Sequence, residues 1–216
     1  MKIDLHIHTK RYSGCSNINP FSLLERAREV GLDGIAVTDH NMIWQKEEKR
    51  ELIKRANGLV ILFGVEVNVK KSDDAVHSKT GEHYLVFWNP QSQPPVVYEY
   101  MEEELLFESV RMAGGVVIVA HPFRFNPQFD KRFLRPYPIN GIEVKSTNID
   151  EDGTQKALAL SDRMGLCQVA GSDAHSLSSV GKFYTEFQAP ISNESDLIKA
   201  VCQRQCSPVI NRQLVR

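Results

Sequence analysis

The segment DLHIHT, residues 4–9, places an aspartate and two histidines at alternate positions of an otherwise apolar run. Alternation of this kind predicts an extended strand, because successive side chains of a strand point to opposite faces. The apolar row is Ile3, Leu5 and Ile7, and the polar row is Asp4, His6 and His8. A polar row of this kind fits either a half-exposed edge strand or a binding site, and the rest of the sequence decides between them.

The overall composition is that of an ordinary globular domain, with 216 residues of which 42% are hydrophobic and 25% charged. A formal net charge of −1 gives no electrostatic basis for broad binding to nucleic acids or membranes. No apolar run approaches the about 20 residues that a membrane span needs, and polar residues interrupt any signal-peptide core near the N-terminus. We therefore expect a cytoplasmic enzyme or binding domain without a membrane partner.

The four cysteines are few and scattered, so we expect reduced thiols and no zinc knuckle. Cys202 and Cys206 lie one helical turn apart in a segment that we predict to be helical. In that helix Cys202 would pack against the core.

Short apolar runs alternate with amphipathic stretches along the chain, which predicts strands that alternate with helices. The predicted strands are residues 2–8, 34–40, 59–67, 82–88, 114–121, 140–146 and 166–173. The predicted helices are residues 19–31, with Asn19 as N-cap, and residues 45–58, 97–113, 154–164 and 194–204. This order favours an α/β domain built on a parallel sheet, either open or closed into a barrel.

Six of the seven histidines lie at the edge of a predicted strand, most of them near its C-terminal end. In a parallel α/β protein these ends meet on one face, where imidazoles and carboxylates would converge. Buried groups of this kind are costly unless they are compensated, and divalent metals are their natural partners. The alternative is a set of unrelated core histidines, each satisfied by hydrogen bonds. We favour the metal cluster, so the polar row of residues 4–8 would face metal.

Six motifs, taken together and in this order, resemble the PHP (polymerase and histidinol phosphatase) superfamily of metal-dependent phosphoesterases. They are DLHIHT, VTDHN, GVEV, EHYLVFW, AHPFR and GSDAHS, and they run from residue 4 to residue 176. The resemblance implies a single domain over residues 1–216 with a distorted (β/α)7 TIM-like barrel. It also implies two or three divalent metal ions at the C-terminal mouth of that barrel.

The same resemblance implies which side chains bind each metal. His6 and His8 with Glu66 and Asp173 would hold the first metal, and Glu66 would bridge to a second. His83 and His121 would complete the second site, and His40 and His175 would bind a third metal. Gly14 stands where three-metal members commonly carry a further ligand, so Cys15, Asn17 or solvent would substitute there, or the third site is absent.

Several charged neighbours have a functional and a structural interpretation. Asp4 would orient a histidine ligand or accept hydrogen bonds from a backbone turn, whereas Asp39 is predicted to be structural. Arg124 is our candidate for binding phosphate, and His40 or His175 would donate a proton to the leaving group if no third metal binds. The remaining charged candidates, which we interpret as solvated, are Lys10, Arg11, His77 and Lys145.

The implied reaction is hydrolysis of a phosphate ester by a hydroxide that bridges the metals. The substrate would be a small phosphorylated metabolite, a nucleotide or a short oligonucleotide end. Hydrolysis of a C–N bond, as in amidohydrolases, and a noncatalytic metal-binding PHP module are the alternatives. Zinc, manganese and iron all suit the mixed histidine and carboxylate ligands, and the sequence makes no prediction about oligomeric state.

Overall fold

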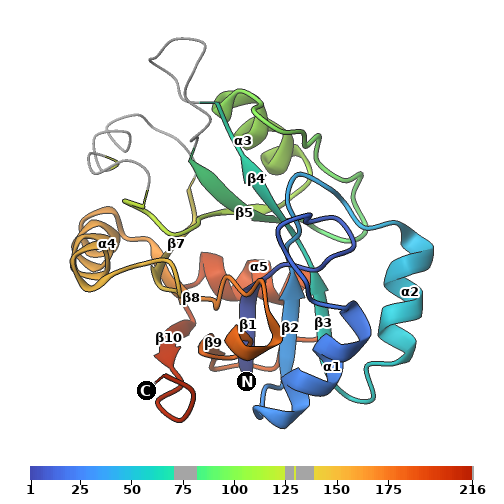
Figure 1. Ribbon diagram of the computed structural model, residues 1–216. Coiled ribbons are helices and arrows are strands. Elements are labelled where there is room, and N and C mark those ends of the chain that lie inside the picture. Colours follow the sequence, from blue (N-terminus) through green and yellow to red (C-terminus); the bar gives the residue numbers. More distant parts are fainter. Residues whose placement is uncertain (71–81, 125–128, 130–138, 216) are drawn as a thin grey trace.

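The computed structural model describes residues 1–70, 82–124, 129 and 139–215, and it shows a single α/β domain (Figure 1). The predicted polar loop at residues 70–81, with His77, lies almost wholly outside the described residues. The described elements are, in order, β1 (Lys2–Ile7), α1 (Pro20–Glu29), β2 (Gly34–Val37), α2 (Lys46–Lys54), β3 (Val60–Phe63), β4 (Val65–Asn68), β5 (His83–Phe87), α3 (Glu103–Met112), β6 (Val116–Val119), β7 (Gly141–Lys145), α4 (Glu151–Met164), β8 (Cys167–Ala170), a 3-10 turn (Leu177–Ser179), β9 (Phe183–Phe187), α5 (Glu194–Cys202) and β10 (Cys206–Ile210).

The strands form two five-stranded mixed sheets. Sheet A has the strand order β10-β9-β1-β2-β3, and sheet B has the order β4-β5-β6-β7-β8. Strands β1, β2 and β3 are parallel, as are β6, β7 and β8, whereas β9, β10, β4 and β5 pair antiparallel with their neighbours. The two sheets are not closed into the (β/α)7 barrel that the sequence led us to expect.

The chain passes from sheet A to sheet B at Gly64, so the predicted single strand over residues 59–67 is wrong. It consists instead of β3 and β4, which belong to different sheets. A Cβ atom at Gly64 would lie 2.6 Å from the Phe87 ring and 2.8 Å from the Val86 carbonyl oxygen. Only glycine lets the backbone approach β5 this closely, and the break sends β4 across to pair with β5.

The sheets touch at one rim through two isolated bridges. Ile7, at the end of β1, pairs with Ala174 beyond β8, and His40 beyond β2 pairs with Glu66 in β4. Ile7, Ala174 and His40 lie at or beyond the C-terminal ends of parallel strands, where the sequence predicts the site to be, and Glu66 joins them from β4. The fold therefore brings distant parts of the chain together at this rim.

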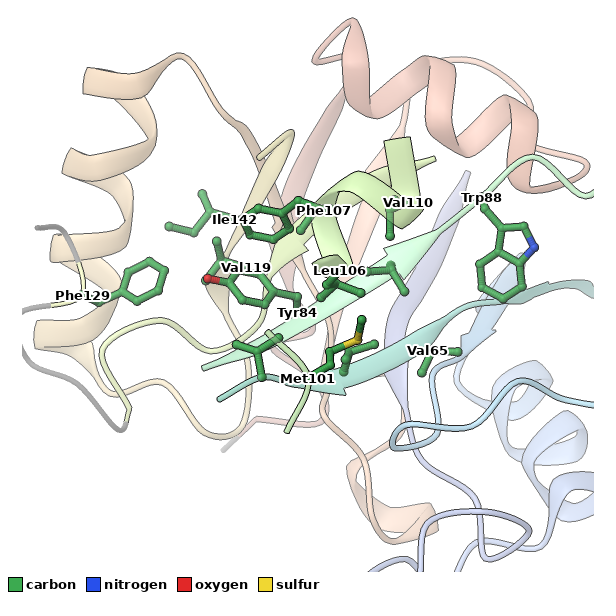
Figure 2. Close-up of a cluster of buried hydrophobic side chains, with 14 of the residues drawn as sticks. Val65, Tyr84, Trp88, Met101, Leu106, Phe107, Val110, Val119, Phe129 and Ile142 are labelled. Atoms are coloured by element: carbon green, nitrogen blue, oxygen red, sulfur yellow. The ribbon is translucent and has the colours of Figure 1, made fainter. Parts of the chain in front are cut away.

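The hydrophobic core has three parts that define the layers. One cluster packs α1 and α2 against sheet A, and a second lies between the sheets with α5 against it. The third packs α3 and α4 on the outer face of sheet B, where Tyr84 meets Phe107 edge-on at 5.1 Å between ring centroids (Figure 2). Figure 1 shows α1, α2, α3 and α4 towards the outside of the molecule and α5 near its middle.

An irregularity in β1 alters the faces that alternation predicts. The pairing with β2 shifts register between Asp4 and Ile7. Ile3 and Leu5 belong to the cluster between the sheets, but Ile7 belongs to the outer cluster of sheet A. The predicted common face of the three residues is therefore wrong, because a bulge changes the parity of every residue that follows it.

The helix predictions hold except at their ends and near the C-terminus. Asn19 caps α1 by accepting a hydrogen bond from the Phe21 N–H at 2.9 Å. Helix α3 begins at Glu103, later than predicted, and β9 and β10 were not predicted at all. Cys206 lies in β10 and Cys202 is exposed, so the predictions of a shared helix and of a packed Cys202 are wrong. Within the described ranges, none of the helices is both long and apolar enough to cross a bilayer.

Candidate metal centre

The structure brings all eight predicted metal ligands to the rim where the two sheets touch. Three of them lie within strands, namely His6 in β1, Glu66 in β4 and His83 at the start of β5. The others follow the ends of β1, β2, β6 and β8, and they are His8, His40, His121, Asp173 and His175. Sheet A and sheet B each supply part of the set.

Four of these side chains have the spacing of ligands around one cation. The Nε2 atoms of His6 and His8 are 3.0 Å apart, and each lies 3.2–3.4 Å from oxygens of Glu66 and Asp173. Ligand atoms at about 2.1 Å from a tetrahedral zinc stand about 3.4 Å from one another. His6, His8, Glu66 and Asp173 also form one of the groups of donor atoms close enough to share a metal ion.

Hydrogen bonds at the far side of each ring hold a proton on Nδ1 of His6 and His8, so the neutral form of each imidazole carries its lone pair on Nε2. His6 Nδ1 lies 3.0 Å from Glu143 Oε1, and a carboxylate only accepts, so Nδ1 carries the hydrogen. The Ser13 hydroxyl donates to Asp39 at 2.7 Å and therefore accepts from His8 Nδ1 at 3.1 Å. Two lone pairs then face each other beside two carboxylates, an arrangement that a bound cation stabilises.

Glu66 is the hub of the cluster. Its Oε1 lies 2.9 Å from His83 Nδ1 and 2.8 Å from His121 Nε2, and its Oε2 lies 2.9 Å from His40 Nδ1. Nevertheless, Oε2 is buried and receives no well-aligned hydrogen bond from any described residue. Buried carboxylate oxygens are normally satisfied, so this orphaned atom also fits a metal ligand.

The described residues form two further groups of donor atoms, one of His40, Glu66 and His83 and the other of His8, His40 and His175. The rings of His40 and His175 both stack against His8, each with its centroid 4.3 Å from that of His8, and their own centroids are 6.1 Å apart. His8 is buried, whereas its two partners are partly exposed. Cys15, one of the predicted substitutes for a missing ligand, is exposed and belongs to none of the groups formed by the described residues.

The electrostatics of the cluster favour bound positive charge. Burial disfavours a charged His6, but Glu143, Asp173 and Glu66 outweigh it and raise its pKa well above the ordinary value. Burial likewise opposes ionisation of Glu66, yet the nearby His6 and His83 hold the pKa of its carboxyl well below the usual range. The site therefore attracts cations, and protons and metal ions compete for the same nitrogen atoms.

Two ligands have strained backbones. The φ angles of His121 and Asp173 are 28° and 49°, in the left-handed region that non-glycine residues rarely adopt. Such strain costs about 1–3 kcal/mol per residue and clusters at functional sites. Gly171 allows the chain that leads to Asp173 to pass close to His6, because a Cβ atom at position 171 would lie 2.5 Å from His6 Cβ.

Sequence reasoning missed two groups that support the ligands. Glu143 in β7 is fully buried, and besides His6 it binds the His121 backbone N–H at 2.8 Å. Its signal was a carboxylate between Ile142 and Val144 in a strand predicted to be buried. Asn148 donates to Asp173 Oδ2 at 2.5 Å from a loop that carries no such pattern.

The two aspartates near the histidines have structural contacts. Asp4 accepts hydrogen bonds from the backbone N–H groups of Ser172 and Gly181 at 2.8 and 2.9 Å. It contacts His6 only through the backbone N–H, at 3.3 Å, so it matches the backbone-turn interpretation. Asp39 binds the Thr9 N–H at 2.6 Å and the Trp44 indole at 2.8 Å, besides Ser13.

Arg124 lies at the edge of the centre, with Nη1 3.5 Å from Asp173 Oδ2. Next to it is a cavity of about 530 Å³ lined by Phe123, Arg124, Asn148 and Lys156, among others. Three other cationic candidates contribute nothing to the cluster among the described contacts. Arg11 pairs with Glu48, Lys145 pairs with Glu151 at 3.1 Å, and Lys10 is exposed.

Comparisons with known sequences agree with this geometry. A family model described as PHP-associated matches residues 153–206. An uncharacterized protein of Methanocaldococcus jannaschii is 31% identical over 133 residues, which are 57% of this chain and 68% of that protein. The PolC-type DNA polymerase III of Lacticaseibacillus paracasei is 29% identical over 159 residues, and this match spans 70% of the chain but only 10% of the polymerase.

Solved structures share the fold across nearly the whole chain. A proposed metal-dependent phosphoesterase from Bifidobacterium adolescentis superimposes with a TM-score of 0.64 at 18% identity, covering 94% of this chain and 96% of that one. An amidohydrolase from Chromobacterium violaceum with bound sulfate gives a TM-score of 0.69 at 18% identity over 100% of both chains. The motifs, the site and the sequence relatives together show that this chain belongs to the PHP superfamily.

Proposed function

We propose that this protein is a metal-dependent phosphoesterase that hydrolyses a small phosphorylated substrate at the rim where its sheets meet. The observation that carries the proposal is the group of His6, His8, Glu66 and Asp173, in which the two Nε2 atoms are 3.0 Å apart and each lies 3.2–3.4 Å from carboxylate oxygens of Glu66 and Asp173. Only the position of Gly14 departs from the ligand pattern of the superfamily, which disfavours a noncatalytic PHP module.

We assign the ligands to metals by the superfamily pattern, although the donor atoms of Glu66 and His83 also group with His40. His6, His8, Glu66 and Asp173 would hold one divalent ion, and Glu66 with His83 and His121 a second. His40 and His175, stacked on His8, would hold a third. When bound, such ions polarise phosphoryl oxygens and lower the pKa of water towards neutrality. Zinc, manganese and iron fit these donors equally.

Arg124 is the residue that we assign to the phosphate. Its guanidinium group is about one third exposed and already lies beside an oxygen of Asp173 at the cavity edge. A planar, permanently charged guanidinium binds phosphate oxygens in pairs, and it stabilises the charge that spreads over them in the transition state. The positive charge of Arg124 therefore favours a phosphate ester over an amide, which is the substrate of an amidohydrolase.

His40 and His175 are the candidates for moving a proton. Both are partly exposed, and both can be reached from solvent at the mouth of the site. Burial, followed by the neighbouring His8, lowers the pKa of His175, which keeps this imidazole neutral near pH 7. With no third metal bound, either residue could pass a proton to the leaving oxygen, but His175 only in the imidazolium form that its lowered pKa disfavours.

The test is a panel of substrates offered to protein reconstituted with zinc, manganese or iron(II). The panel contains p-nitrophenyl phosphate, bis-p-nitrophenyl phosphate, short oligonucleotides and simple amides. We expect metal-dependent release of phosphate or of a phosphate monoester. Glu66→Gln should abolish this turnover, whereas Glu151→Gln, which changes an exposed carboxylate on α4, should not. Cleavage of amides alone, or metal binding without any turnover, would overturn the assignment.

A further inference from the structure

Two cysteines face each other at the seam where β8, the edge strand of sheet B, meets β10, the edge strand of sheet A. This seam is distinct from the crossing between the sheets at Gly64. Cys167 opens β8 at the edge of sheet B, and Cys206 opens β10 at the edge of sheet A. Their sulfur atoms are 2.8 Å apart. Cys206 Sγ also lies 3.8 Å from the Gln168 carbonyl oxygen, so β8 holds this thiol at two points.

The surroundings fix both side chains. Cys167 is buried in the cluster between the sheets, and Cys206 packs against that cluster while remaining partly accessible. The neighbouring strand strengthens the seam, because the Thr185 hydroxyl in β9 accepts a hydrogen bond from the Ala170 N–H at 2.9 Å and lies 2.8 Å from the Ala170 carbonyl oxygen. Neither sulfur therefore needs a backbone rearrangement to reach the other.

We propose that Cys167 and Cys206 are a redox modification site, at which a peroxide converts the thiol pair into a disulfide that joins sheet A to sheet B. The proposal is independent of the phosphoesterase function. The bond would lie at the start of β8, whereas Asp173 follows the other end of that strand.

Cys206 is the thiol that reacts first. The hydrogen bond from Cys167 outweighs burial and lowers the pKa of the Cys206 thiol, whereas that hydrogen bond and burial raise the pKa of Cys167. The thiolate is the nucleophile, and Cys206 is also the more accessible of the two.

The chemistry balances with hydrogen peroxide as the two-electron oxidant. The Cys206 thiolate attacks one peroxide oxygen, the O–O bond breaks, and the departing hydroxide takes up a proton as water. Cys167 then attacks the sulfur of the Cys206 sulfenic acid and loses its proton, while the S–O bond breaks and a second water leaves. The two thiols lose two electrons, and the peroxide is reduced to two molecules of water.

Trypsin separates the relevant cysteines, so peptide mapping can test the pairing directly. Cleavage after Arg163, Lys182, Lys199, Arg204 and Arg212 places Cys167 in peptide 164–182, Cys202 in 200–204 and Cys206 in 205–212. The full chain is treated with hydrogen peroxide in the presence of a chelator, free thiols are blocked, and the digest is analysed without reduction. We expect peptide 164–182 linked to 205–212, with a mass loss of two hydrogens from the intact chain.

Variants provide matched controls. Cys202→Ser should leave the linked peptide unchanged, because Cys202 is exposed and its only described hydrogen bond is a 4.0 Å contact from Asn140. Cys206→Ser should abolish the linked peptide. Persistence of all four thiols, linkage of 164–182 to 200–204 or a disulfide between two chains would each overturn the proposal.

A second readout needs no variant. The bond closes a loop over a sequence separation of 39 residues, and restricting the unfolded chain in this way should raise Tm by about 5–10 °C. Oxidised wild-type protein should show this increase, and reduction should reverse it. An unchanged or lower Tm would show that the bond does not fit the native seam.

Discussion

Replacing Glu143 with glutamine tests how the protein holds its metal ligands in place. The carboxylate accepts two hydrogen bonds in a fully buried setting, from His6 Nδ1 at 3.0 Å and from the His121 N–H at 2.8 Å. Glutamine keeps the shape but has only one accepting oxygen. Its NH₂ group must then face one of these two donors, or His6 must move its proton to Nε2 and block the metal-binding lone pair.

The expected loss of zinc affinity in Glu143→Gln follows from these contacts. One charge-assisted hydrogen bond is worth about 1.5–3 kcal/mol, and substitutions behind a metal-binding histidine typically lower metal affinity about 10- to 100-fold. The two estimates agree, because a 100-fold change in Kd corresponds to about 2.8 kcal/mol. We therefore expect Glu143→Gln to bind zinc about 10- to 100-fold more weakly than the wild-type protein.

Zinc affinity would be measured by competition with a chromophoric chelator, alongside urea unfolding of both proteins. Glu103→Gln is the matched control, because Glu103 is also a buried carboxylate, and it accepts a hydrogen bond from the Tyr84 hydroxyl in the core of sheet B. The control should lose stability but keep its zinc affinity. Wild-type affinity in Glu143→Gln would refute the role that we give to this carboxylate.

Three further predictions concern metal, substrate and thiol chemistry. A chelator should abolish turnover and lower Tm, and zinc, manganese or iron(II) should restore both. His6→Ala should fold but bind less metal, and activity that survives chelation would contradict the metal mechanism. Arg124→Ala should raise KM or lower kcat for phosphate esters about tenfold, the value of one charge-assisted hydrogen bond, while Arg111→Ala, which removes an exposed partner of Glu108 on α3, leaves the kinetics unchanged. Alkylation of Cys206 should have its pH midpoint below that of an ordinary thiol, because the thiol must ionise before it reacts and the pKa of Cys206 is lowered. Cys202, whose pKa is raised by partial desolvation, should react with a higher midpoint, and identical midpoints would contradict the Cys167 hydrogen bond.

The convergence of the ligands could be predicted from the sequence because it follows from strand parity and strand ends alone. His121 follows the run VVIV at residues 116–119, whose β-branched residues indicate a buried strand, and His40 and Asp173 follow shorter apolar runs. Parallel strands then bring such residues to one edge without any knowledge of side-chain packing.

Other features depend on contacts that a single segment does not reveal. The run over residues 59–67 is apolar on both sides of Gly64, so only the approach of Phe87 shows that the strand breaks there. Strand β10 contains Pro208 and starts four residues after the end of α5, which made a continued helix the simpler prediction. Glu143 was overlooked because its partner His6 lies 137 residues away.

The passage of the chain through Gly64 divides the proposed metal ligands between two segments of the chain. Residues 1–63 contain His6, His8 and His40 but neither of the carboxylates, and residues 65–215 contain Glu66 and Asp173 with the remaining three histidines. A metal ion bound by both segments would link them across the molecule. Release of the ion and separation of the two segments would therefore be coupled. Neither segment alone would therefore hold the complete proposed metal site, and neither should show partial activity.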